Sequence, residues 1–214
     1  MDLKYSFAYY PIGLNNNMEK AASLDEALDL ISKKYVKLKP ESGAALKKCA
    51  SIEIFEKNTI LVSANQYSKT LMFMVTGALR AYYLKDGKDI SDWFAFENDF
   101  ICEINSFYLD KPSDHYFETL ERSTIMILPK ESILKLCDQY HDIESLARQS
   151  TTKTMIGLQR RLVSLQFETA LQKYNNLLMA YPDITQRVSL GHIASFLGIT
   201  FETLSRIRNP KNSS

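Results

Sequence analysis

The stretch that decides the fold of the C-terminal part is Leu190-Gly-His-Ile-Ala-Ser-Phe-Leu-Gly-Ile-Thr-Phe-Glu-Thr-Leu-Ser-Arg-Ile-Arg208. Two short helices that cross at a sharp angle need a small residue where their backbones approach, and Ala194 meets that need. The turn between them needs a residue that tolerates a positive φ, and Gly198 is such a residue. The apolar residues between the helices would be Ile193, Leu197, Ile199, Leu204 and Ile207. The segment therefore predicts a helix-turn-helix.

Once this inner face is assigned, polar and aromatic side chains remain for the outer face of the second helix. Thr200 is suited to cap the helix, and Glu202 places an anion at its positive end. An arginine such as Arg206 has five fixed donors that can meet guanine O6 and N7 in a major groove. The residues predicted to contact DNA are Thr200, Phe201, Glu202, Ser205, Arg206 and Arg208. The alternative is an αα-hairpin whose outer face is only solvated.

Charge is distributed unevenly along the chain. From Thr151 onward there are eight Lys or Arg against three Asp or Glu, a net charge of +5, whereas the first 150 residues carry −4. A basic C-terminal third on an acidic body suggests that this end meets a polyanion. A basic face that is merely solvated is the alternative.

A long helix is predicted from about Asp142 to Phe167. Its seam repeats at close to 3.5 residues and consists of Ile143, Leu146, Ser150, Thr154, Leu158, Leu162 and Leu165. Such a repeat is typical of helices that pair with a second helix. We predict a dimer interface at Leu158, Leu162 and Leu165. The alternative is an ordinary helix that faces the core, and the polar middle of the seam would weaken any pairing.

An all-β pattern fills the chain from Ile52 to Leu128, where short segments rich in Val, Ile, Phe, Tyr and Thr alternate with turn residues. The segments Thr70–Gly77 and Ala78–Leu84 flank a turn. The Asp-Gly pair within Lys85–Lys88 closes the next hairpin. Ser123–Leu128 reads as the last strand.

Helical periodicity surrounds this β region. It predicts a helix from about Met18 to Tyr35, with Ser23 and Asp25 as start signals, and a short helix after Pro40. Further helices are predicted over Lys130–Cys137 and from about Glu168 to Tyr181, where Pro182 ends the second one.

These motifs together resemble the cyclic-AMP receptor protein / fumarate-nitrate regulator (CRP/FNR) family, in particular its shorter members. Ile193-Ala-Ser-Phe-Leu-Gly-Ile-Thr-Phe-Glu-Thr-Leu-Ser-Arg206 is similar to the family's recognition motif. Thr76-Gly-Ala-Leu-Arg-Ala-Tyr-Tyr-Leu-Lys-Asp-Gly87 and Trp93-Phe-Ala-Phe-Glu-Asn-Asp-Phe100 are similar to its β-roll. The resemblance runs from about Ile52 to Arg208.

The resemblance implies an α+β fold with three parts. Residues 1–140 would form the sensor domain, which consists of N-terminal helices and a double-stranded β-helix, a β-roll of the cyclic-nucleotide-binding type. A dimerisation helix would follow over 141–167. A helix-turn-helix DNA-binding domain, winged-helix-like with a truncated wing, would occupy 168–214, since the sequence beyond Arg208 is too short for the usual β-hairpin wing.

The sequence departs from the family where cyclic nucleotides bind. The family's Gly-Glu-Leu segment becomes Cys102-Glu103-Ile104, and the position of its phosphate-binding arginine falls at Ser113, followed by Asp114. A phosphodiester would lose its charge-assisted hydrogen bonds there and meet a repelling acid. Glu103, Ser113 and Asp114 are therefore predicted to form a degenerate ligand pocket that does not bind cyclic AMP. Glu103 could accept a bond from a hydroxyl or be a surface or strand-end acid. Phe201, where the well-known receptor has an arginine, indicates a different base preference.

Other function classes receive no support. The three His residues fit no HExxH motif and no GxSxG motif is present, so we predict no catalytic residues. The three Cys residues form no CxxC, the single early Cys49 does not suit an iron–sulfur cluster, and we predict no metal or cofactor. No membrane segment or secretory signal is seen, which favours a cytoplasmic protein.

The predicted function is that of a homodimeric, sequence-specific transcription regulator. Its expected partners are double-stranded DNA with an inverted repeat and a second copy of the chain, and RNA polymerase is a further candidate. The alternative is a sensor module that acts through protein contacts and has a degenerate helix-turn-helix.

Overall fold

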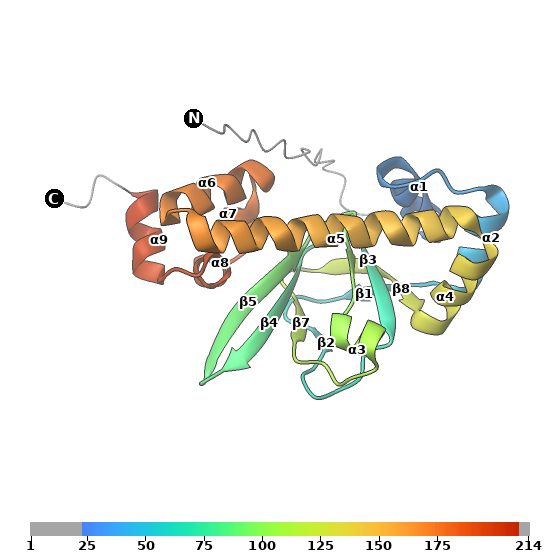
Figure 1. Ribbon diagram of the computed structural model, residues 1–214, viewed down its shortest axis with the longest axis horizontal. Coiled ribbons are helices and arrows are strands. Elements are labelled where there is room, and N and C mark those ends of the chain that lie inside the picture. The colour runs from blue at the N-terminus through green and yellow to red at the C-terminus, as the bar shows by residue number, and fades with distance from the viewer. Residues whose placement is uncertain (1–22, 210–214) are drawn as a thin grey trace. The chain divides into compact units, whose positions relative to one another are not determined.

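The computed structural model describes residues 23–209 (Figure 1). Helix α1 (Leu24–Lys34) begins at Ser23, whose hydroxyl accepts a hydrogen bond from the backbone NH of Glu26. Ser23 is thus confirmed as a start signal, while the expected helical residues 18–22 lie outside the described part. Helix α2 (Pro40–Cys49) begins at the proline that predicted it.

Eight antiparallel strands form the β-roll, as the resemblance implies. They are β1 (Ser51–Phe55), β2 (Ile60–Val62), β3 (Thr70–Thr76), β4 (Leu79–Lys85), β5 (Lys88–Ala95), β6 (Phe100–Ile101), β7 (Tyr116–Thr119) and β8 (Ser123–Pro129). One sheet has the order β1-β8-β3-β6 and the other β2-β7-β4-β5.

Successive side chains of β3 and β8 point to opposite faces of the first sheet, and both faces are buried. Met72, Met74 and Ile125 face the second sheet and form one apolar cluster with it. The intervening residues, among them Phe73 and Met126, belong to a second cluster that includes residues of the flanking helices. Because neighbouring strand residues point to opposite faces, continuous apolar runs are required here.

The prediction of successive hairpins is half right. Asp86 and Gly87, both with positive φ, close the β4–β5 hairpin as expected. In contrast, β3 and β4 belong to different sheets and do not pair. Gly77 turns the chain from one sheet to the other with φ of 96°, and a Cβ atom there would lie 2.7 Å from the Ser123 Cα atom. The segment is therefore a corner between the sheets.

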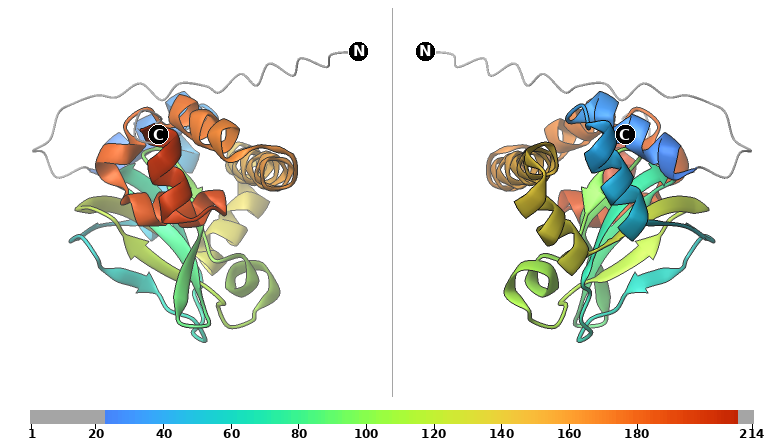
Figure 2. Two further views of the ribbon diagram at one scale, coloured as in Figure 1. Left: turned by 90° about the vertical axis from the view of Figure 1, so that its left-hand side faces the viewer. Right: turned by 90° about the vertical axis from the view of Figure 1, so that its right-hand side faces the viewer.

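A short helix interrupts the region that the sequence indicated as entirely β. Helix α3 (Ile104–Leu109) lies between β6 and β7, and it begins at Glu103. With only six residues it is too short to show a helical period among apolar positions. Figure 2 shows α3 and α4 (Lys130–Gln139) on the same side of the sheets.

Helix α5 (His141–Phe167) has the predicted length, and its first half packs on the β-roll. Ile143 and Leu146 are buried in the helix-side cluster. Further along, the Lys153 Nζ atom lies 2.6 Å from the Asp99 Oδ1 atom. At Gly157, a Cβ atom would lie 2.7 Å from the Trp93 ring, so only glycine allows this approach.

The seam of α5 differs from the prediction. Ile143 and Leu146 belong to the core, and Ser150 and Thr154 are half-buried, so these four do not continue an exposed seam. Four exposed apolar side chains of α5 instead follow one another at intervals of three and four residues: Met155, Leu158, Leu162 and Leu165. We call these four residues the α5 ridge.

The chain divides into two compact units within α5, after Arg160. In the second unit, the end of α5 is followed by α6 (Ala170–Ala180), which begins with a capping box at Thr169 and Gln172. The short helix α7 (Ile184–Arg187), absent from the prediction, follows the Pro182 turn. Helices α8 (Leu190–Leu197) and α9 (Phe201–Arg208) complete the unit.

Candidate functional site

The predicted pair of C-terminal helices is present, with α8 and α9 joined by a tight turn. Ala194 is buried at the contact, and Gly198 ends α8 with φ of 65°. The Thr200 hydroxyl caps α9 by accepting a hydrogen bond from the Thr203 backbone NH, at 3.1 Å. Of the five predicted apolar residues, Ile193, Leu197 and Leu204 are buried, and the other two are half-buried.

The outer face of α9 carries every residue predicted to contact DNA. Phe201 is 51% exposed, although it is a large aromatic side chain. The exposed residues beside it are Thr200, Glu202, Ser205, Arg206 and Arg208. Because Leu204 is fully buried, the rotation of α9 about its own axis is fixed. Glu202 and Arg206 lie on the opposite side of the helix, while Phe201 and Arg208, three and four residues from Leu204, lie along its flanks.

The basic residues of this unit fall into two groups. Arg161 donates to the Phe196 carbonyl oxygen at 2.8 Å and lies over the Phe196 ring, and Arg187 pairs with Asp183 at 3.5 Å. In contrast, Arg206 and Arg208 have no hydrogen bond or ion pair to another residue within 23–209. Their guanidinium groups remain available to an anionic partner.

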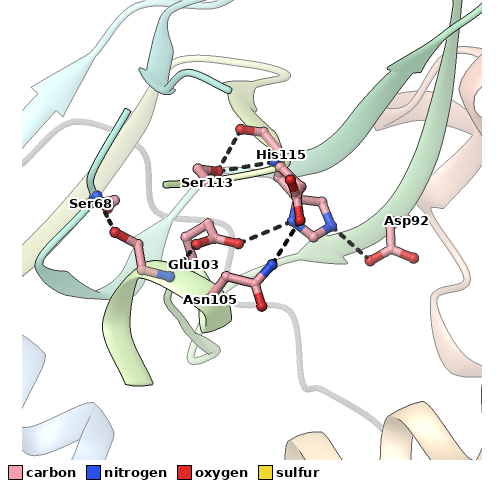
Figure 3. Close-up of polar contacts among 8 residues, drawn as sticks. Ser68, Asp92, Glu103, Asn105, Ser113 and His115 are labelled. Atoms are coloured by element: carbon pink, nitrogen blue, oxygen red, sulfur yellow. Dashed lines mark hydrogen bonds and ion pairs between the residues drawn. The ribbon is translucent and has the colours of Figure 1, made fainter. Parts of the chain in front are cut away.

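The predicted degenerate pocket is a filled polar cluster in the β-roll (Figure 3). Glu103 is buried, and its Oε2 atom accepts a hydrogen bond from the Ser106 backbone NH at 2.6 Å, which caps α3. The interpretation of Glu103 as a surface acid is therefore wrong. The reason is that α3 begins at this position and needs an acceptor for its free NH groups.

His115, which the sequence analysis did not select for this pocket, lies at the centre of the cluster. Its Nδ1 atom lies 3.3 Å from the Glu103 Oε1 atom, and its Nε2 atom 3.2 Å from the Asp92 Oδ2 atom. Burial lowers the pKa of the imidazole, but the hydrogen bonds and charges of Asp92 and Glu103 outweigh burial and raise it overall. Both ring nitrogens can donate only when the imidazole is protonated, so this geometry favours the cation.

Ser113 and Asp114 are already engaged. The buried Ser113 hydroxyl accepts from the His115 backbone NH at 3.0 Å and donates to the His115 carbonyl at 2.8 Å. The exposed Asp114 accepts from the Asn105 side-chain amide at 2.9 Å. Three carboxylates and one imidazole thus occupy the region where a cyclic nucleotide phosphate would need cations. The arrangement disfavours an anion.

The sequence could not indicate His115 or Asp92 because no motif links them. His115 directly precedes β7 and Asp92 lies in β5, and they meet because both strands belong to the same sheet. In residues 23–209, no three His, Cys, Asp or Glu side chains form a group that could hold a metal ion.

The β-roll with its polar cluster has the architecture of a cyclic nucleotide-binding domain, and comparison with known proteins agrees. Residues 52–140 match the family model of the cyclic nucleotide-binding domain. No curated protein matches the sequence. Among the described residues, none of the helices is long and apolar enough to cross a membrane.

Solved structures extend the comparison beyond the β-roll. FixK2 from Bradyrhizobium japonicum is 18% identical with a TM-score of 0.65, covering 75% of this chain and 83% of its own. A CooA mutant from Carboxydothermus hydrogenoformans is 17% identical with a TM-score of 0.66, covering 89% and 84%. CLP, a c-di-GMP responsive global regulator from Xanthomonas campestris, is 14% identical with a TM-score of 0.63, covering 80% and 91%. Residues 52–140 thus form a cyclic nucleotide-binding-type domain, and the chain shares the fold of these regulators, which confirms the fold that the resemblance implies.

Proposed function

We propose that the protein is a homodimeric transcription regulator that recognises a specific DNA sequence through α9. The observation that carries the proposal is the outer face of α9, where Phe201, Ser205 and Arg206 are exposed on a helix held by the buried Leu204. A helix of this kind can enter a major groove, and an unpaired arginine can form two hydrogen bonds with a guanine.

Dimerisation through the α5 ridge is the second part of the proposal. Met155 and Leu162 are 62% and 56% exposed, which is unusual for apolar side chains that repeat at helical spacing. A second copy of α5 would cover them. Leu165 also approaches the α8–α9 turn, since a Cβ atom on Gly198 would lie 3.3 Å from its Cδ2 atom. Leu158 and Leu162 are therefore the principal interface residues of the proposal.

The resulting two-fold dimer would present two α9 helices to successive major grooves, so the target would be an inverted repeat. RNA polymerase would be a further partner of the DNA-bound dimer. The similar solved structures support a regulatory role, since they include the global regulator CLP from Xanthomonas campestris.

Fluorescence anisotropy with a labelled random-sequence duplex at low salt separates this function from a module that acts through protein contacts. We expect binding whose affinity falls steeply with added salt, because phosphate contacts release counterions. The comparison variant is Arg208→Ala, which removes one exposed cation of α9 and should bind the random duplex more weakly. Equal anisotropy with and without protein at low salt would contradict the proposal.

A further inference from the structure

A cavity of about 330 Å³ lies inside the 21–160 unit, separate from the polar cluster. Its walls come from α1, α2, β3, β6, α3, β8, α4 and α5, most of which are labelled in Figure 1. Neither Glu103 nor Ser113 or Asp114 lines it. The volume falls at the lower end of the range of small-molecule sites, roughly 300–1,000 Å³.

The inner part of the cavity is apolar. Its floor consists of the buried side chains Phe100, Phe107, Leu128, Ile133 and Leu146. A cavity of this lining does not hold ordered water well, because water needs two or more polar partners. An apolar group would gain contacts with every wall and would leave water in doing so.

The mouth has a different character. Tyr108, Leu134 and Met155 line the cavity and are about half exposed or more, so an apolar rim faces solvent. Arg148 is the one charged side chain among the described lining residues. Its guanidinium reaches only the Ser145 hydroxyl, at 3.4 Å, and it has no carboxylate partner within 23–209.

We infer that this cavity binds a small amphipathic anion, whose apolar body occupies the floor and whose carboxylate or sulfonate meets Arg148. An exposed arginine beside an apolar cavity is complementary to such a molecule in both shape and charge. The inference does not depend on DNA binding. Because Met155 lines the cavity and also belongs to the α5 ridge, an occupant would contact the surface proposed for dimerisation.

The test uses the full chain and the probe 1-anilinonaphthalene-8-sulfonate, which has an aromatic body and one anionic group. We expect saturable fluorescence enhancement that decanoate reverses by competition. The substitution Ala147→Phe adds bulk at a lining position and removes no core side chain, so it should abolish the enhancement. Far-UV circular dichroism checks that this variant is folded.

The exposed Arg148 supplies a second variant that does not disturb the core. Arg148→Gln should weaken decanoate binding roughly tenfold, since hydrogen bonds to charged groups contribute more than neutral ones. Binding of uncharged decan-1-ol should stay unchanged. Arg122→Gln, at an exposed arginine that does not line the cavity, is the matched control and should alter neither.

Three outcomes would overturn the inference. The first is an absence of probe binding to the wild-type chain. The second is unchanged probe binding to a folded Ala147→Phe variant. The third is probe binding that appears only after Leu158→Ala and Leu162→Ala disrupt a dimer, which would mean that a second copy of the chain covers the cavity.

Discussion

At the scale of single residues, Ser113 and His115 determine the electrostatics of the β-roll pocket. Ser113 stands where the resemblance requires an arginine, and its hydroxyl is already bonded to the His115 backbone. The loss of the arginine could be predicted from the sequence, since the motif aligns residue by residue. The presence of a buried imidazole between two carboxylates could not, because its partners lie 12 and 23 positions away.

The first prediction is that cyclic AMP does not bind at physiological concentration. Its phosphate would meet Glu103, Asp92 and Asp114 and would find no arginine. Isothermal titration calorimetry measures this directly. Micromolar affinity would contradict the electrostatic account.

The second prediction concerns pH. The folded state raises the pKa of His115 above its unfolded value of about 6.5, so its contribution to stability is fully present below that value. The contribution is lost as pH rises through the raised folded pKa. Urea midpoints measured from pH 5 to pH 9, roughly the range in which histidine titrates, should therefore fall more steeply in the wild-type chain than in His115→Gln. If the urea midpoints of the two proteins change with pH in parallel, Asp92 and Glu103 do not stabilise the His115 imidazolium.

The third prediction is that Arg206 reads a base. Arg206→Ala should cost ~1–3 kcal/mol on the preferred DNA sequence and little on random duplex. Anisotropy titrations give the loss of affinity on the preferred duplex and on the random duplex, and the two losses are compared. A loss by the same factor on both would make Arg206 a phosphate contact only.

At the scale of elements, the sequence indicated α5 well but not the direction in which it faces. Periodicity gave its extent because helical spacing is a local property. It assigned Thr154 rather than Met155 to the seam, because Thr154 lies four residues and Met155 three residues before Leu158, and helical spacing allows both intervals. The direction in which α5 faces is set by two contacts with residues distant in the sequence, Gly157 with Trp93 and Lys153 with Asp99.

The fourth prediction tests the contact between α5 and the β-roll. Gly157→Ala improves helix propensity by about 1 kcal/mol, but its Cβ atom would displace the Trp93 ring. Because Trp93 is the single tryptophan of the chain, tryptophan fluorescence reports the surroundings of this ring, which include the contact with α5. We expect a red-shifted emission maximum with unchanged far-UV circular dichroism.

Gly191→Ala is the matched control for Gly157→Ala. It lies in α8, where a Cβ atom would approach nothing closer than 4.0 Å, and it should leave the emission unchanged. If Gly157→Ala also leaves the emission unchanged, the close packing of α5 on β5 is wrong.

At the scale of the whole molecule, the fold could be predicted wherever local patterns carry it. The α8–α9 turn follows from Ala194 and Gly198, which stand four residues apart. The pairing of β3 with β8 could not be predicted, since it joins residues about 50 positions apart. For the same reason the apolar cavity was not foreseen, because its lining extends from Ile31 to Met155.

The fifth prediction is that the chain is a dimer in solution. Leu158→Ala together with Leu162→Ala should give a monomer, since truncation of a leucine buried in an interface costs ~2–5 kcal/mol. Sedimentation equilibrium measures the mass. An unchanged dimer would place the interface elsewhere.

The most direct test of the central proposal is selection of bound sequences from a library of random duplexes by the full-length protein. We predict enrichment of an inverted repeat whose half-site centres lie about 34–36 Å apart, one helical turn, to match two α9 helices in a two-fold dimer. The Arg206→Ala variant should fail to enrich it. If the wild-type chain enriches no sequence over the starting library, the protein is not a sequence-specific DNA-binding regulator.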